Sequence, residues 1–236
     1  MSIRTAMGRA CKDMFRFTEQ SGCDLAAEYL LTVRVAEAIA EHSAMLLKVR
    51  LEMRTKKFAT QCFPLLKHTP SGDPLRPKSV LRRRRDITHR PGRIDVAVMT
   101  DCVGDEQPVC AIEVKRLTPS DKLVRQDLER NAAYFALRNQ IGERPLLEFT
   151  ALAALHRYRS GYRGVEDIQK ARKLYERRTL KITLPEGVTS QVHVFSADEL
   201  EEPIYNFEAA EVDQDAYLLM GIIIVFHWAE HSAPVW

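Results

Sequence analysis

The sequence predicts an α/β protein in which helices flank a mixed central β-sheet. Two short runs rich in β-branched residues, Arg93–Val98 and Val109–Lys115, are separated by a turn-forming segment and favour a β-hairpin. Helical patterns over 24–49 and 120–140 precede and follow this hairpin, and an apolar run over 146–158 comes next. Helices that alternate with extended segments are typical of layered α/β domains.

Composition bounds the class of protein. The chain has 236 residues, 45% of them hydrophobic and 28% charged, with a formal net charge of +3, which predicts one soluble domain spanning 1–236. The five cysteines are odd in number and lack C-x-x-C spacing, which argues against a disulfide framework and favours a cytoplasmic location. The longest apolar stretch, 218–226, is shorter than the ~20 residues that span a bilayer, so we expect no membrane association.

The N-terminal part predicts one long helix. We expect residues 1–21 to be a loose lead-in with a single helical turn around 12–17. Asp24 can cap the helix that follows, and a carboxylate, Glu28, falls on its apolar stripe. Glu37 lies nearer the flank, where it meets solvent. The stripe itself consists of Leu25, Thr32, Val35 and Ile39.

The next segments are a strand and a long irregular region. Val49–Phe58 alternates between apolar and polar residues, which predicts a strand with one wet face. Residues 64–91 contain five prolines and predict a long loop. This loop ends in a basic patch that precedes Asp95 and suits a polyanionic substrate. The patch consists of Arg82, Arg83, Arg84, Arg85, Arg90 and Arg93.

A helix with two distinct faces follows the hairpin. Ser120 is a suitable N-cap, and Leu123, Ala132, Phe135 and Ala136 can form part of the buried face. A polar and aromatic stripe repeats every four residues through Gln126, Arg130 and Tyr134. Beyond it the sequence predicts a strand over 146–158, an amphipathic helix over 165–178 and strands over 191–196 and 217–228.

The predicted hairpin carries the chemistry. Asp95, Glu113 and Lys115 lie inside apolar strands, where an unpaired charge costs several kcal/mol or more. Glu113 and Lys115 are two residues apart and therefore share a face. The two carboxylates suit Mg²⁺ or Mn²⁺, and the carbonyl of Val114, between Glu113 and Lys115, could be a further ligand. Such an ion polarises a phosphate and activates a water molecule. Lys115 can orient the water or stabilise developing charge. The alternative is a surface ion pair between Glu113 and Lys115 on a solvated face.

The residues Gly92-Arg93-Ile94-Asp95 and Ile112-Glu113-Val114-Lys115 resemble the motif of the PD-(D/E)XK nuclease superfamily, which includes restriction endonucleases and DNA-repair nucleases. The resemblance covers 24–158 and implies a restriction-endonuclease-like core with the order α-β-β-β-α-β, to which 159–236 add a C-terminal extension. It implies that Asp95 and Glu113 bind metal, that Lys115 is catalytic and that Glu28 joins the site. Gln126 with Tyr134 is similar to a polar feature of the family's following helix, whereas Ile94 replaces the proline of the family name.

These features together predict a metal-dependent endonuclease that cuts phosphodiester bonds in DNA, with double-stranded DNA favoured. The arginine patch, Gln126, Arg130 and Tyr134 would bind substrate. Cutting both strands needs two sites, so we expect a homodimer or a higher homo-oligomer, in bacterial or phage defence or in DNA processing. The alternatives are a non-catalytic nucleic-acid-binding or assembly protein that retains the fold, and an RNA-directed nuclease. Single features also have alternative interpretations. Glu28 could pair with an arginine such as Arg93, and Gln126 and Tyr134 could take part in ordinary helix–sheet packing. The arginine run could lie in a solvated loop or a dimer contact.

Overall fold

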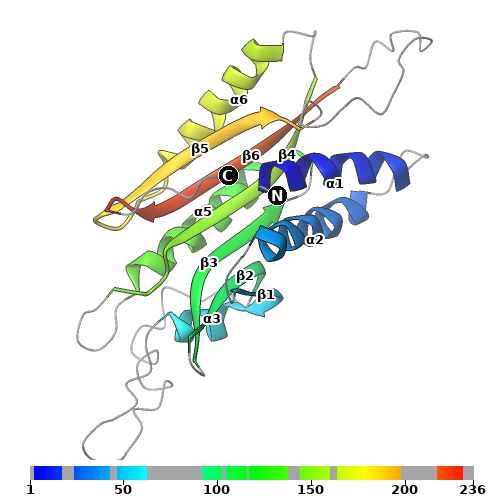
Figure 1. The fold of residues 1–236 in the computed structure, drawn as a ribbon. Helices are drawn as coiled ribbons and strands as arrows, with labels where there is room; N and C mark the ends of the chain where they lie inside the picture. The colour runs from blue at the N-terminus through cyan, green and yellow to red at the C-terminus, as the bar shows by residue number, and fades with distance from the viewer. Residues whose placement is uncertain are drawn as a thin grey trace, which may run out of the picture.

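The computed structural model describes residues 3–17, 24–42, 47–62, 92–102, 105–115, 117–137, 144–159, 164–197 and 217–230. The helices are α1 (Ile3–Phe17), α2 (Asp24–His42), α3 (Thr55–Gln61), α5 (Asp121–Ala136) and α6 (Gly164–Thr179). The strands are β1 (Leu47–Arg54), β2 (Arg93–Cys102), β3 (Asp105–Lys115), β4 (Phe149–Arg159), β5 (Val188–Ser196) and β6 (Tyr217–Trp228) (Figure 1). None of the helices in these ranges is long and apolar enough to cross a membrane.

The strands form one six-stranded sheet in the order β1-β2-β3-β4-β6-β5. β3 and β4 are parallel and are connected through α5, whereas the other neighbours are antiparallel. The predicted α/β architecture with a mixed sheet and flanking helices is therefore confirmed. β5 and β6, which lie beyond residue 159, extend the same sheet, because β6 pairs with β4 along the whole length of β4.

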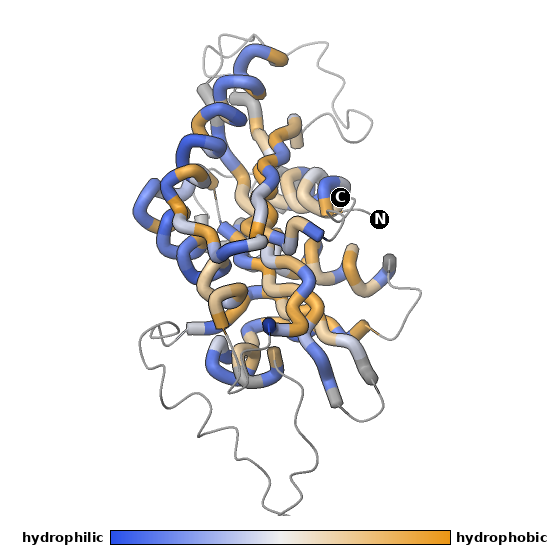
Figure 2. The backbone as a smooth tube through the Cα atoms, turned by 90° about the vertical axis from the view of Figure 1, so that its left-hand side faces the viewer, coloured by the Kyte–Doolittle hydropathy of each residue, from blue (hydrophilic) through white to orange (hydrophobic). Residues whose placement is uncertain are grey.

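Helices cover both faces of the sheet, and each face has its own apolar core. α3, α5 and α6 pack on one face, where Phe58, Leu128 and Tyr175 are among the buried residues. α1 and α2 pack on the other, around Met7 and Leu31. Figure 1 shows the two helical layers on opposite sides of the strands, and Figure 2 shows hydrophobic strands inside and hydrophilic turns of helix outside.

The N-terminal segment corrects one prediction. The expected loose lead-in is a helix, α1, that spans Ile3–Phe17. Most of its buried residues are small, and they recur at three- and four-residue intervals, which makes one narrow apolar stripe. This stripe consists of Ile3, Ala6, Met7, Ala10 and Cys11. An ion pair of 2.6 Å between Asp13 Oδ2 and Arg34 Nη2 joins α1 to α2. The charged residues between the apolar ones concealed the pattern in the sequence.

Two further predictions were wrong in detail. The strand expected over Val49–Phe58 ends at Arg54, and Thr55–Gln61 forms α3. Phe58 of this helix is buried and packs against Tyr134, with the two ring centroids 5.2 Å apart. Leu123, expected in the buried face of α5, is 48% exposed. It lies in the first turn, on the solvent side of the N-cap, where the Leu123 amide donates to Ser120 Oγ over 3.4 Å.

The β2–β3 hairpin is confirmed and is longer than expected. β3 begins at Asp105, so much of the segment assigned to the turn belongs to the strand. Pro108 pairs with Met99 where the register shifts between Val98 and Met99. A proline has no amide hydrogen to donate to a ladder, and a β-bulge accommodates it.

Candidate active site

The site lies where β2 and β3 separate. Pairing between these strands runs to Val96 opposite Ile112, whereas β2 stays paired with β1 as far as Arg93. β3 in turn stays paired with β4 as far as Lys115. The two strands thus part at the positions that carry Asp95 and Glu113, which makes room for polar side chains between apolar layers.

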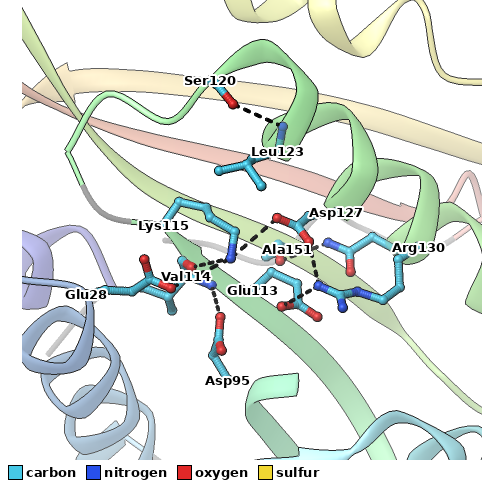
Figure 3. Close-up of polar contacts among 11 residues, drawn as sticks. Glu28, Asp95, Glu113, Val114, Lys115, Ser120, Leu123, Asp127, Arg130 and Ala151 are labelled. Atoms are coloured by element: carbon cyan, nitrogen blue, oxygen red, sulfur yellow. Dashed lines mark hydrogen bonds and ion pairs between the residues drawn. The ribbon is translucent and has the colours of Figure 1, made fainter. Parts of the chain in front are cut away.

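Asp95 fills this fork from β2. Its Oδ2 accepts a hydrogen bond of 2.6 Å from the Val114 amide, which a regular ladder would direct to a backbone carbonyl (Figure 3). Asp95 thereby fixes the end of β3 next to its own carboxylate. The carboxylates of Asp95 and Glu113 lie close enough for their charges to influence each other.

Glu113 is the most deeply buried charged group of the site, with 1% of the residue exposed. One oxygen, Oε2, lies 2.8 Å from Arg130 Nη2 on α5. Its other oxygen, Oε1, is buried and has no hydrogen-bond partner among the described residues. Because a buried acceptor without a partner is costly, Oε1 is a position at which a ligand would be stabilising.

Lys115 shares a face with Glu113, as the strand alternation predicted. Its ammonium donates to the Val114 carbonyl over 2.9 Å and lies 3.4 Å from Asp127 Oδ2 on α5. It also lies 3.8 Å from Glu28 Oε1 on α2, where the Glu28 side chain is 39% exposed. Helices from both layers therefore reach the end of β3, and the catalytic candidate lies between their carboxylates (Figure 3).

Asp127 belongs to the site, and the sequence prediction missed it. Its Oδ1 lies 2.5 Å from Arg130 Nη2, and its Oδ2 faces Lys115. The signal was present in the sequence, because Val124, Asp127, Leu128 and Asn131 follow each other at three- and four-residue intervals and are all buried. A carboxylate on that inward stripe is as exceptional as Glu28 is on α2.

The pKa values of the site's charged groups are set by burial and, in the opposite direction, by the charges and hydrogen bonds of their neighbours. Burial raises the pKa of Glu113 to about 8, although the Arg130 guanidinium acts in the opposite direction. Burial also raises the pKa of Asp95, against the effect of the Val114 amide and of Lys115. Burial alone would lower the pKa of Lys115, but the surrounding carboxylates, Asp127 foremost, outweigh it and leave that pKa raised. Lys115 is therefore a cation at neutral pH.

The site has an excess of negative charge when fully ionised. Four carboxylates, Glu28, Asp95, Glu113 and Asp127, face two cations, Lys115 and Arg130. Two negative charges thus remain, which is the charge that one divalent cation neutralises. Within the described ranges no group of three or more His, Cys, Asp or Glu side chains is arranged to hold a metal by itself. Mg²⁺ often needs fewer, because it keeps waters and substrate phosphate in its shell.

Comparisons with protein-family models, with curated proteins and with solved structures found no match. The geometry and charge of the site itself therefore carry the functional inference.

The remaining predicted residues lie in different places. Arg82, Arg83, Arg84, Arg85 and Arg90 fall outside the described residues. Arg93 is exposed on β2 and faces Glu52 over 3.9 Å, so the arginine expected as an alternative partner of Glu28 pairs elsewhere. Gln126 is half-buried on α5. Tyr134 is buried with its hydroxyl unpartnered among the described residues.

Two predicted ligands have contacts of another kind. Arg130, predicted to bind substrate, contacts Glu113 and Asp127. The Val114 carbonyl, predicted to complete a metal shell, accepts a hydrogen bond from Lys115. Their predicted roles toward substrate and metal stay predictions.

Proposed function

We propose that the protein is a metal-dependent nuclease with a restriction-endonuclease-like core that hydrolyses phosphodiester bonds in DNA. The observation that carries this proposal is the convergence of Asp95, Glu113 and Lys115 at the fork between β2 and β3. Glu113 is buried, and Asp95 and Lys115 are half-buried beside it inside apolar strands. Such a group of charges costs folding free energy, and a structural ion pair would not need the third group.

The donor set fits Mg²⁺ or Mn²⁺. Both ions prefer hard oxygen ligands, and Asp95 and Glu113 supply carboxylate oxygens. The buried Oε1 of Glu113, which lacks a partner among the described residues, is an oxygen that a cation would satisfy. When bound, such an ion would polarise the scissile phosphate and lower the pKa of a water. With all four carboxylates ionised, the excess of two negative charges supports a divalent rather than a monovalent cation.

The chain's own residues then have separate tasks. Asp95 and Glu113 would hold the ion, with the Val114 carbonyl as a further oxygen. Lys115, kept cationic by the carboxylates around it, would stabilise the negative charge that develops on the phosphate. Glu28 supports Lys115 from α2, at 3.8 Å. The low-dielectric surroundings strengthen each of these interactions relative to water.

The proposed substrate is double-stranded DNA, and the proposed assembly is a homodimer, because cleavage of both strands needs two sites. Arg93 and the arginines at 82–85 and 90 would contact the phosphate backbone, which gives affinity without sequence information. Gln126, which is half-buried on α5, would join them. Tyr134 was predicted to do the same, but its side chain is buried against Phe58 and does not reach the surface. Defence against foreign DNA, or DNA processing, in a bacterial or phage setting is the biological role that we propose.

The test is cleavage of supercoiled plasmid with Mg²⁺ by the wild type, Lys115→Met and Glu113→Gln. We expect both variants to lose activity by on the order of 10²–10³-fold, since each removes a group that acts on developing charge or holds the ion. Glu106→Gln is the matched control, because Glu106 lies on the same strand but pairs with Arg50 outside the site. It should cleave like the wild type.

The outcomes separate the alternatives. Equal cleavage by all four proteins would point to a contaminating nuclease. Binding of DNA without cleavage in Mg²⁺ or Mn²⁺ would favour a non-catalytic protein that retains the fold. Cleavage of a single-stranded RNA of matched sequence in preference to the plasmid would favour the RNA-directed enzyme.

A further inference from the structure

Asp127 and Arg130 on α5 lie opposite Glu113 and Lys115 on β3, so that each charged side chain of the strand faces one of opposite charge on the helix. Arg130 faces Glu113, with 2.8 Å between Nη2 and Oε2, and Asp127 faces Lys115, with 3.4 Å between Oδ2 and Nζ. Asp127 and Arg130 also contact each other over 2.5 Å. Each charge of the strand pair thus has its own partner on the helix (Figure 3).

The arrangement prevents a simpler pairing. Glu113 and Lys115 share a face two residues apart, and their charges already attract each other. Without the helix pair, the two side chains could neutralise one another, which would cost the site both a metal ligand and a catalytic cation. Arg130 instead holds Oε2 of Glu113 and leaves Oε1 unpartnered among the described residues. Carboxylates that bind metals are commonly oriented by such outer hydrogen bonds.

We propose that Asp127 and Arg130 are positioning residues that hold Glu113 and Lys115 apart, so that Glu113 presents Oε1 to the metal and Lys115 keeps its charge for the phosphate. This inference rests on the proposed nuclease function and deepens it. It assigns Arg130 to the protein's own carboxylate rather than to DNA, and it gives Asp127 a role that the sequence prediction had not assigned.

The test uses a double variant that leaves the net charge of the site unchanged. Asp127→Asn with Arg130→Gln removes one negative and one positive charge. A change in cation binding would therefore come from the altered positions of Glu113 and Lys115 and not from a change in the net charge of the site. The same helix offers a matched control, because Arg125 and Glu129 form an exposed ion pair of 2.8 Å. Arg125→Gln with Glu129→Gln removes the same charges from the solvent side of α5.

Calorimetric titration with Mn²⁺ alone is the first readout. We expect the Asp127/Arg130 double variant to bind Mn²⁺ about 10- to 100-fold more weakly than the wild type, the range for lost outer contacts of a metal ligand. The Arg125/Glu129 variant should bind like the wild type. Arg130→Lys alone keeps the charge and should retain more affinity than the double variant. Circular-dichroism melting gives the folded fraction, to which each affinity is normalised.

Plasmid cleavage at saturating Mn²⁺ is the second readout. Because neither residue touches substrate in this proposal, kcat should fall about 10- to 100-fold while KM for DNA changes little. Unchanged Mn²⁺ affinity with a raised KM would overturn the proposal and make Arg130 a DNA contact. Tighter Mn²⁺ binding would overturn it too, since Arg130 would then compete with the ion.

Failure of the inference and failure of the proposed function give different results. A wild type that binds Mn²⁺ and cleaves, with a double variant that does both equally well, overturns the positioning role alone. A wild type that neither binds Mn²⁺ nor cleaves DNA overturns the nuclease function and, with it, the positioning role.

Discussion

Glu106 and Glu113 lie on the same strand, β3, yet their surroundings differ in every respect that matters for chemistry. The Glu106 side chain is 19% exposed near the turn of the hairpin and pairs with Arg50 and Lys48 of β1. A hydrogen bond from Arg50 lowers its pKa. Glu113 is 1% exposed at the open end of the hairpin, and burial raises its pKa to about 8.

The difference shows how one strand can carry a carboxylate in a structural ion pair and another in the site to which we assign the proposed function. Where β2 and β3 stay paired, the carboxylate reaches the sheet edge and finds cations in partly solvated surroundings. Where they separate, the carboxylate points inward and keeps one oxygen unpartnered among the described residues. The surroundings of the two carboxylates differ accordingly: Glu106 pairs with two cations of β1, whereas Glu113 pairs with Arg130 through Oε2 alone and its ionised form is disfavoured by burial. Substitutions at the two positions should therefore act in opposite directions on stability.

The largest expected effect on stability is that of Glu113→Gln, measured with a chelator present. The folded pKa of about 8 lies above the unfolded value, so the wild type loses stability as pH rises from about 4.5 to 8. The variant lacks this loss, and its advantage should reach about 1–3 kcal/mol at pH 9 and be small at pH 5. Urea unfolding at both pH values measures it. An advantage of equal size at pH 5 and pH 9 would show that the charge is not the cause.

A smaller effect is expected from Glu28→Gln on cleavage. Glu28 approaches Lys115 only to 3.8 Å and is partly solvated, so its contribution should be below about 1 kcal/mol, or up to about 5-fold in kcat. Glu37→Gln is the control on the same helix, because Glu37 pairs with Arg34 at the surface. A loss for Glu28→Gln as large as that for Lys115→Met would make Glu28 a metal ligand.

The smallest effect is that of Glu106→Gln on stability. Its lowered pKa means that the carboxylate stabilises the fold above its unfolded pKa and loses this contribution as pH falls through the folded pKa. The variant should be less stable than the wild type by at most about 1 kcal/mol at pH 7, and this difference should disappear as the pH falls through the lowered folded pKa. In 1 M NaCl the difference at pH 7 should shrink, whereas the effect of Glu113→Gln should persist. Urea unfolding at low and high salt distinguishes the two.

Much of the architecture was predictable because strands and helices have different periods. The hairpin of β2 and β3, the Ser120 N-cap of α5 and the late strands β5 and β6 all carry local signals. α1 was missed because most residues of its apolar stripe are small and charged residues lie between them. α3 was missed because it follows β1 without an intervening segment, and the left-handed φ of 54° at Glu52 near the end of β1 has no sequence signature.

The candidate site was predictable in part for a similar reason. Alternation places Glu113 and Lys115 on one face, and the stripe of α2 places Glu28 inward. The sequence spacing on α5 predicted the stripe that contains Arg130 but not its target, because the approach of α5 to β3 depends on tertiary packing. Asp127 was overlooked for that reason, although it shares the buried face with Val124 and Leu128.

The most direct test of the central claim is the binding of Mn²⁺ by calorimetry to the wild type, Asp95→Asn, Glu113→Gln and Glu106→Gln. If Asp95 and Glu113 share one divalent ion, the wild type and Glu106→Gln bind it with similar affinity, and each of the other two variants loses on the order of 100-fold or more. If the four proteins bind Mn²⁺ equally, or if Glu106→Gln loses as much affinity as Glu113→Gln, the metal is not held at the fork of β2 and β3.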